Sequence, residues 1–423
     1  MINKIEKICV LITVFLIPFY IFRFNFLGIP SNIFELMVAV SVAITAYNKF
    51  TKTYNLDFSF RWGRIWPYLF ILTALFGVLI ADDKATALGI LKGWFIIPVA
   101  LYWLILNNFK SKELPQISLS LFLSVIIISV WAILQRSGLI TTLFYQANDA
   151  NFNQYLAPTN FRVFGPFESP NYLAMFLAPA LTLSLPSLLL LRKTVGKIFL
   201  VLLFILPLLA IYFSASRGGL IALAVVLVVA LLLFSVKSYL GRVGRIEAKL
   251  ILGLSYSVKA LLTLGFVGVL AKIMMGSPFS RPVLGTDQSR TEIYKQSLLM
   301  LKENYLTGIG LGGFRDKIEV ATENMVSFRQ FLLPYALHPH NLYLALWLNL
   351  GLAGIIIFTI ILYRFAKDVR KISGLMRLGL ILAMLAILTH GIVDTTYFKN
   401  DLSAIFFLTI ALSQVAGREN EKA

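Results

Sequence analysis

Cysteine is almost absent from this sequence. The 423 residues include one cysteine, Cys9, and three histidines. A single thiol cannot form a disulfide within the chain, so a disulfide-framework fold is excluded and thiol chemistry is a poor explanation of function. Acidic residues are also few, with 20 Asp and Glu against 38 Lys and Arg, which gives a formal net charge of +18. Such a charge needs either an anionic partner or a membrane setting.

Apolar residues dominate what is present. They make up 58% of the chain, and the mean hydropathy is +0.82, whereas soluble domains are about 45–50% apolar. Apolar runs of about 20 residues, each long enough to cross a bilayer, recur along the whole length. The sequence therefore predicts an all-α polytopic membrane protein with about twelve transmembrane helices. The predicted spans are residues 8–27, 31–47, 65–81, 86–106, 116–134, 170–190, 197–213, 218–235, 256–275, 340–363, 375–391 and 402–416.

The basic residues are distributed as in a membrane protein. Most Lys and Arg lie in short loops between apolar runs, and loops rich in them alternate with loops that are poor in them. Because cytoplasmic loops carry the excess of Lys and Arg, we expect the basic loops and both termini in the cytoplasm. The net charge then requires no nucleic-acid partner, and the remaining loops face outward.

Two of the outward loops are long. They cover residues 135–169 and 276–339 of a single membrane domain that spans residues 1–423. Loops of this length without a function are uncommon. We therefore expect functional residues in them or beside them.

The larger loop contains a helix signal. Ser289 and Glu292 form a capping box. Ile293, Leu298 and Leu301 are predicted to share an apolar stripe. The pattern predicts an amphipathic helix that begins near Ser289 and lies close to the membrane surface.

Three arginines are predicted at the outer face, against the usual charge bias. Arg162 precedes the Pro170–Asn171 corner of the sixth span, Arg217 lies in "SASRGG" after the seventh, and Arg290 lies in the first turn of the loop helix. Each has a plain alternative, as a surface charge or the anchor of a turn. A cation beside a helix N-terminus is unfavourable, however, unless an anion binds there. Because guanidinium groups match phosphate oxygens bidentately, the three predict a site for the head group of a phosphorylated or pyrophosphorylated lipid.

Histidines beside the tenth span complete this candidate site. "HPHN", with His338, His340 and Asn341, opens the span, and Asp394 follows the eleventh. Residues at i and i+2 do not share a helix face, and no Cys or Glu completes a ligand set, so no metal site is predicted. A histidine here is either a structural cap or a general base, because a helix N-terminus favours the neutral ring that accepts a proton.

One glycine motif is rejected. "GIGLGG", residues 308–313, matches the pattern of a dinucleotide-binding loop. It follows a predicted helix rather than a strand, so the context of that loop is missing. We therefore predict no cofactor.

Four motifs, in this order, resemble the O-antigen ligase and O-antigen polymerase family. They are "RVFGPFESPNYLA", "SASRGGLIAL", "SRTEIYKQSLLMLKENYLTGIGLGGF" and "HPHNLYLALWLNLGLAG". The resemblance is most specific over residues 160–360. It implies a C-type glycosyltransferase-like helical fold in the inner membrane of a bacterium, with the active site on the outer, periplasmic face. It also implies metal-independent transfer of a glycan en bloc from undecaprenyl pyrophosphate to a lipid or glycan acceptor. A single in-line displacement would invert the anomeric carbon.

The resemblance also implies roles for single residues. Arg217 and Arg290 match motif arginines and would hold the pyrophosphate, and His340 matches the motif histidine and would deprotonate the acceptor hydroxyl. The residues expected to contact substrate are Arg162, Asn171, His338, Asn341 and Asp394. The chain departs from the family at Glu168-Ser169, where Gly-Asn is common, so the role of Glu168 stays open. The role of Asp394 stays open too, between orienting His340 and contacting a sugar.

Two other classes of function stay open. A secondary transporter of an anion or a lipid-linked sugar would place ionisable residues in mid-span, where this chain has few. A structural scaffold would leave the outward arginines without a purpose. Ligases and polymerases share their chemistry, so the sequence does not separate them, nor does it give the sugar, the acceptor or the oligomeric state.

Overall fold

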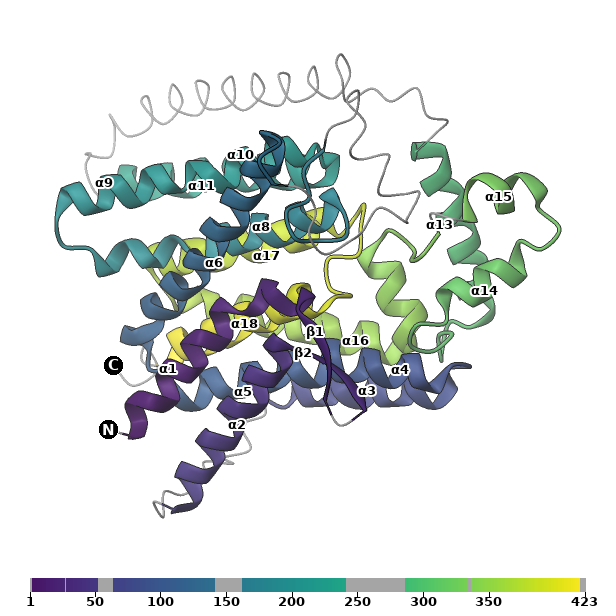
Figure 1. Ribbon diagram of the computed structural model, residues 1–423, viewed down its shortest axis with the longest axis horizontal. Helices are drawn as coiled ribbons and strands as arrows, with labels where there is room; N and C mark the ends of the chain where they lie inside the picture. The colour runs from purple at the N-terminus through teal and green to yellow at the C-terminus, as the bar shows by residue number, and fades with distance from the viewer. Residues whose placement is uncertain are drawn as a thin grey trace.

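The chain folds into a helical bundle with a smaller helical extension (Figure 1). The computed structural model describes residues 2–26, 28–51, 64–140, 162–240, 286–333 and 336–418. The elements are α1 (Ile2–Phe15), η1 (Ile17–Ile21), β1 (Arg23–Phe26), β2 (Ile29–Asn32), α2 (Ile33–Thr51), α3 (Trp66–Ile80), α4 (Lys84–Ile90), η2 (Leu91–Ile96), α5 (Ile97–Asn108), η3 (Ser111–Glu113), α6 (Leu114–Arg136), α8 (Pro170–Leu183), η5 (Leu185–Leu190), α9 (Thr194–Leu203), α10 (Ile205–Ser214), α11 (Arg217–Leu240), α13 (Thr286–Glu303), α14 (Phe314–Ala321), α15 (Val326–Phe331), α16 (Leu342–Arg370), α17 (Gly374–His390) and α18 (Asn400–Arg418).

The helices coincide with the apolar runs, as expected for an integral membrane protein. Seven stretches among the described residues are long and apolar enough to cross a membrane: Ile33–Thr51, Lys84–Asn108, Ser111–Arg136, Pro170–Leu190, Thr194–Ser214, Leu342–Arg370 and Asn400–Arg418. Three shorter apolar helices are Trp66–Ile80, Arg217–Leu231 and Gly374–His390. The predicted count of about twelve spans stays a prediction, because the ninth, residues 256–275, lies outside the described residues.

The first predicted span, residues 8–27, ends earlier than expected. Helix α1 stops at Phe15, and β1 and β2 then form an antiparallel hairpin in which Phe26 pairs with Ile29. Pro18 explains the early stop, since proline lacks the N–H that an α-helix interior requires. The hairpin places Arg23 at the end of the bundle where α8 begins, because its guanidinium contacts Glu168.

Helix α18 forms the centre of the bundle. It packs on α5, α8, α16 and α17, and almost all of its residues are buried. The stretch α9–α10 is mostly exposed at the edge. Aromatic side chains fill the centre, among them Phe70, Phe95, Tyr397 and Phe407, which pack edge to face or tilted. A central α18 matters for the site, because the segment that carries Asp394 leads directly into it.

Helices α13, α14 and α15 pack around a core of their own, at the opposite side from the two chain ends (Figure 1). The loop helix is confirmed, but it begins at Thr286, so Ser289 lies inside it rather than at its cap. The predicted stripe is correct for Ile293 and Leu301 and wrong for Leu298, which is 55% exposed. Five residues turn a helix by about 140° beyond one full turn, so Leu298 points away from Ile293.

The segment between α13 and α14, residues 304–313, packs against α16 as a strap where that helix is kinked. Gly351 has a left-handed φ of 66° inside α16. In a continuous helix the N–H of Leu352 would bond the C=O of Leu348. Here that N–H donates to Leu306 C=O (3.1 Å), and the Leu348 C=O accepts from the N–H of Ile309 (2.7 Å). The strap therefore satisfies both backbone groups that the kink releases, as buried membrane helices require.

The glycine motif 308–313 forms part of this strap. It follows α13 and precedes α14. A Cβ on Gly308 would lie 2.4 Å from the carbonyl oxygen of Leu348, and one on Gly310 would lie 2.7 Å from the backbone of Ala81. These glycines therefore permit close backbone packing against α16 and the end of α3.

Candidate active site

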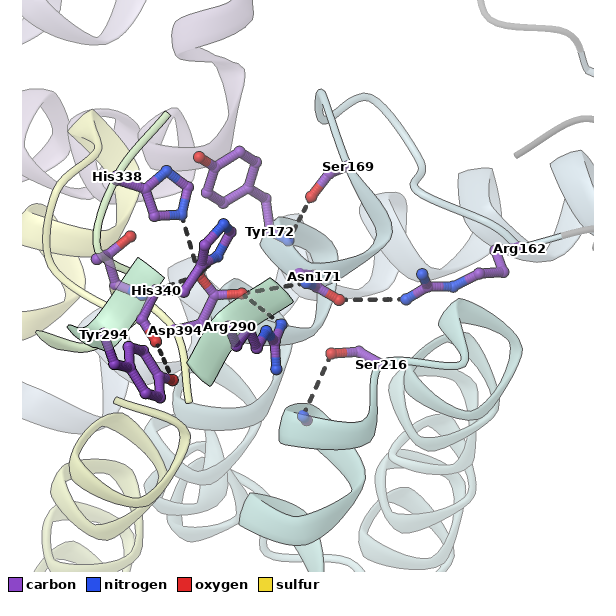
Figure 2. Close-up of polar contacts among 12 residues, drawn as sticks. Arg162, Ser169, Asn171, Tyr172, Ser216, Arg290, Tyr294, His338, His340 and Asp394 are labelled. Atoms are coloured by element: carbon purple, nitrogen blue, oxygen red, sulfur yellow. Dashed lines mark hydrogen bonds and ion pairs between the residues drawn. The ribbon is translucent and has the colours of Figure 1, made fainter. Parts of the chain in front are cut away.

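Asp394 lies at the centre of a polar cluster just after α17. Its side chain is 3% exposed, and its N–H donates to the C=O of His390 at 3.0 Å. Oδ1 lies 3.2 Å from Nε2 of His338 and 3.4 Å from Nδ1 of His340, and it accepts the N–H of Thr395 at 2.9 Å (Figure 2). The two imidazoles predicted beside the tenth span therefore meet a carboxylate from the eleventh.

The second oxygen of Asp394 faces two other chain segments. Oδ2 accepts a hydrogen bond from Nδ2 of Asn171 at 3.1 Å and lies 3.9 Å from Nη2 of Arg290 (Figure 2). The Oδ1 of Asn171 accepts from Nη2 of Arg162 at 3.1 Å, and Nε of Arg162 donates to the C=O of Ser214 at 2.8 Å. One polar network thus joins the end of α10, the start of α8, α13 and the segment after α17.

The histidine loop is held in place on several sides. His340 has a left-handed backbone with φ 49°, which is uncommon for a residue with a side chain. Tyr294 of α13 donates its hydroxyl to the C=O of His340 at 2.8 Å. Asn341 caps α16 by accepting the N–H of Leu344 at 3.0 Å, and its Nδ2 donates to the C=O of Ile392 at 2.8 Å. Asn341, expected to contact substrate, thus ties this loop to the Asp394 segment.

Three of these residues have the geometry of a metal site. The ligand atoms of His338, His340 and Asp394 all lie within 4.8 Å of one another. The argument that residues at i and i+2 diverge is wrong here, because both histidines precede α16 and their ring centroids are only 4.2 Å apart. The carboxylate, however, already accepts from Asn171 and has the Arg290 cation beside it. This environment favours a hydrogen-bonded anion over a bound cation.

Electrostatics fix the charges in the cluster. The pKa of Asp394 lies well below its usual range: burial acts to raise it, but the contacts with His338 and His340 lower it by more. The pKa of His338 is lowered, mainly because burial disfavours the charged ring and also because His340 is adjacent. At neutral pH Asp394 is therefore ionised and His338 is neutral.

Arg217 starts α11 at the same end of the bundle. A Cβ on Gly218 would lie 2.6 Å from Cδ2 of His390, and Gly219 packs equally closely on α8. The glycines beside Arg217 were expected to admit a ligand; in the structure they let α11 approach α17 and α8. The C=O of His390 accepts the N–H of Asp394, so the start of α11, which packs on His390, adjoins the Asp394 segment.

Arg290 reaches the cluster from α13. It was expected in the first helical turn, but α13 begins at Thr286, so Arg290 lies in the second turn. The contact with Asp394 therefore explains its position better than the helix dipole does. Arg217, through its neighbour Gly218, and Arg290 thus both adjoin the segment from His390 to Asp394.

Sequence reasoning missed a second ion-pair group beside the site. Glu168 forms ion pairs with Lys399 and with Arg23, the latter at 3.1 Å, and Nζ of Lys399 lies 4.1 Å from the ring centroid of Tyr172. Burial lowers the pKa of Lys399 although Glu168 opposes the shift. Two cations thus offset the charge of Glu168, whose role the sequence left open. The sequence contained a signal for this group, since Lys399 stands in a loop that the charge pattern predicts to face outward, where Lys is unusual.

The fold and the site define an integral membrane protein with a buried carboxylate, two histidines and arginines clustered at one end of its bundle. Residues 202–359 match the family model described as O-antigen ligase, the family that the four motifs resemble. No curated protein matches the chain. The matched segment contains Arg217, Arg290, His338 and His340, whereas Asp394 lies beyond it.

Proposed function

We propose that the protein transfers a glycan en bloc from undecaprenyl pyrophosphate to an acceptor hydroxyl, on the outer face of a bacterial inner membrane. The family supports a glycosyltransferase with a lipid-linked glycan donor. The observation that carries the proposal is the buried Asp394 carboxylate, which faces His338 and His340 with one oxygen and Arg290 with the other. His340, the candidate base, and Arg290, a candidate residue for binding the pyrophosphate, thus contact the same carboxylate.

In this mechanism the carboxylate orients the base. Nδ1 of His340 faces Asp394, which leaves Nε2 to take the proton of the acceptor hydroxyl. The hydroxyl oxygen forms a bond to the anomeric carbon while the bond from that carbon to the phosphate oxygen breaks. The electron pair leaves on undecaprenyl pyrophosphate, whose charge is stabilised by Arg217 and Arg290. A single displacement of this kind inverts the anomeric carbon and uses no metal.

The family leaves two acceptor classes. We propose an O-antigen ligase-like enzyme that acts on a lipid A core or another surface acceptor, with a repeat-unit polymerase as the alternative. A transporter is less well supported. The ionisable residues within predicted spans that could couple transport to an ion, Lys92 and Glu35, pair with each other at 2.8 Å, and Glu35 lies in the first turn of α2. Neither is an isolated charge in mid-membrane.

The test uses purified protein in nanodiscs with undecaprenyl-pyrophosphate glycan and candidate acceptors. A ladder of product lengths identifies a polymerase, and a single capped lipid identifies a ligase. His340→Ala should lower kcat about 100-fold or more, the usual contribution of a general base. Arg217→Lys should be impaired too, since lysine cannot make the bidentate contact. Arg329→Lys, at an exposed residue of α15, is the control. Near-normal turnover by His340→Ala would remove the base from the mechanism.

A further inference from the structure

Arg162 and Asn171 connect two parts of the site that the chain keeps far apart. Nε of Arg162 is fixed by the C=O of Ser214, three residues before Arg217. Its Nη2 donates to Oδ1 of Asn171, and Nδ2 of Asn171 donates to Oδ2 of Asp394. The side chains form a continuous chain of donors and acceptors from the turn that starts α11 to the central carboxylate (Figure 2).

The direction of this chain is set by Arg162. A guanidinium group has five N–H donors and no acceptor, so only the amide oxygen of Asn171 can face it. The amide nitrogen must then face Asp394, where it meets an ionised oxygen that can only accept. Arg162 therefore decides which way the Asn171 amide points, and that orientation decides how the carboxylate is held.

The segment that carries Arg162 is firmly placed. The N–H of Val163 donates to the C=O of Phe213 at 3.2 Å. The N–H groups of Phe164 and Gly165 both donate to Oε1 of Gln135, a buried residue of α6, at 3.0 Å. Arg162 thus projects from a backbone anchored on two helices, and two of its donor atoms point at protein acceptors.

We propose that Arg162 and Asn171 are positioning residues that orient the Asp394 carboxylate and, through it, His340. They were expected to contact substrate; the geometry instead assigns them to the support of the base. This inference rests on the proposed function for the chemistry that Asp394 and His340 perform. It separates Arg162 from Arg217 and Arg290, which would hold the pyrophosphate.

Two variants test the inference kinetically. Asn171→Asp keeps the acceptor for Arg162 but turns the donor that faces Asp394 into a second carboxylate oxygen. Arg162→Lys keeps the charge but replaces the planar group, whose Nε and Nη2 meet separate acceptors, with a single nitrogen. Both should lower kcat at least tenfold and leave the donor KM, and the Kd for undecaprenyl pyrophosphate alone, within about threefold of wild type. Asn324→Asp, at an exposed turn residue, should change neither.

A second measurement does not depend on catalysis. The chain has three histidines, so ¹⁵N-labelled imidazole gives three sets of ring-nitrogen signals. Asn171→Asp and Arg162→Lys should shift the signals of His338 and His340, which face Asp394, by more than those of His390. Asn324→Asp should shift none of them. Single His→Asn variants assign the signals.

The outcomes separate the possible failures. A tenfold rise in the donor KM or in the Kd for undecaprenyl pyrophosphate, with kcat unchanged, would make Arg162 a pyrophosphate ligand and overturn the inference. Unchanged kcat together with unmoved signals of His338 and His340 would overturn it as well. If wild-type protein transfers no glycan and binds no pyrophosphate lipid, the proposed function fails. The ring-nitrogen signals still decide whether Arg162 and Asn171 orient Asp394.

Discussion

At the scale of single residues, the site depends on a charge that is buried and well partnered. A buried carboxylate is unfavourable unless hydrogen-bond donors or cations surround it. Asp394 has donors at both oxygens and a guanidinium nearby, so burial strengthens these contacts instead of neutralising the group. The same contacts fix the direction in which it presents Oδ1 to His338 and His340.

The depressed pKa of Asp394 leads to a prediction about stability and pH. Asp394→Asn should lower the unfolding free energy at pH 7 by about 2 kcal/mol, because buried donors lose a charged acceptor. A carboxyl whose folded pKa is lowered stabilises the protein fully above the unfolded value, about 3.9. That stabilisation is lost as the pH falls through the folded value. Unfolding in detergent at pH 7 and below pH 4 measures it.

The matched control is Asp316→Asn, at an exposed residue of α14. It should change the unfolding free energy by less than about 0.5 kcal/mol at either pH. A stability difference between wild type and Asp394→Asn that persists unchanged well below pH 4 would mean that the carboxylate is not held in the ionised form.

At the scale of elements, the start of α11 is placed by small residues. A Cβ at position 218 would meet Cδ2 and Nε2 of His390 and a methyl carbon of Val393 at 2.6–2.8 Å. His390 is 2% exposed, so its ring has little room to withdraw. The close approach of α11 to α17 therefore sets where Arg217 stands relative to the Asp394 segment.

Gly218→Ala should disturb this approach. The added methyl group should destabilise the protein by about 1–3 kcal/mol through overpacking and reduce glycan transfer by moving Arg217. Gly89→Ala in α4 is the control, because a Cβ there meets nothing within 4 Å. It should be neutral or stabilising by up to about 1 kcal/mol. Thermal unfolding and transfer rates of both variants check this; equal behaviour of the two would contradict the close packing.

At the scale of the whole molecule, the site and the chain ends lie at opposite ends of the bundle. The site gathers the starts of α8, α11, α16 and α18, while α18 ends and α1 begins on the far side (Figure 1). Basic residues follow the ends of η5 and α16, which lie away from the site, among them Arg192, Lys193 and Lys371. The positive-inside rule therefore predicts that the far end is cytoplasmic and that the site faces outward.

Cysteine labelling tests this orientation. In a Cys9→Ala background, Leu337→Cys lies beside the site at a residue that is 62% exposed, and Lys193→Cys lies at the far end. A membrane-impermeant maleimide should label Leu337→Cys in intact spheroplasts and Lys193→Cys only after the membrane is opened. The reverse pattern would place the site in the cytoplasm and contradict the proposed donor.

Much of the fold and part of the site could be predicted from local patterns. Hydropathy located the helices, and the loop motifs located α13, His340 and Arg290, because those signals depend on neighbouring residues. Helix starts were less certain: α13 begins at Thr286, since the capping box at Ser289 is only one of several possible starts. The pair of Lys399 with Glu168 was missed, because its members are 231 residues apart.

The sequence by itself determined that this chain enters a membrane as helices, where its charges lie and which family its middle segment matches. These properties follow from composition and short-range order. Only the tertiary structure decided that one carboxylate faces two histidines and an arginine, and that Arg162 acts on it through Asn171. Contacts of this kind depend on how α8, α10, α13, α16 and α17 pack together, and no periodicity within a single helix encodes that packing.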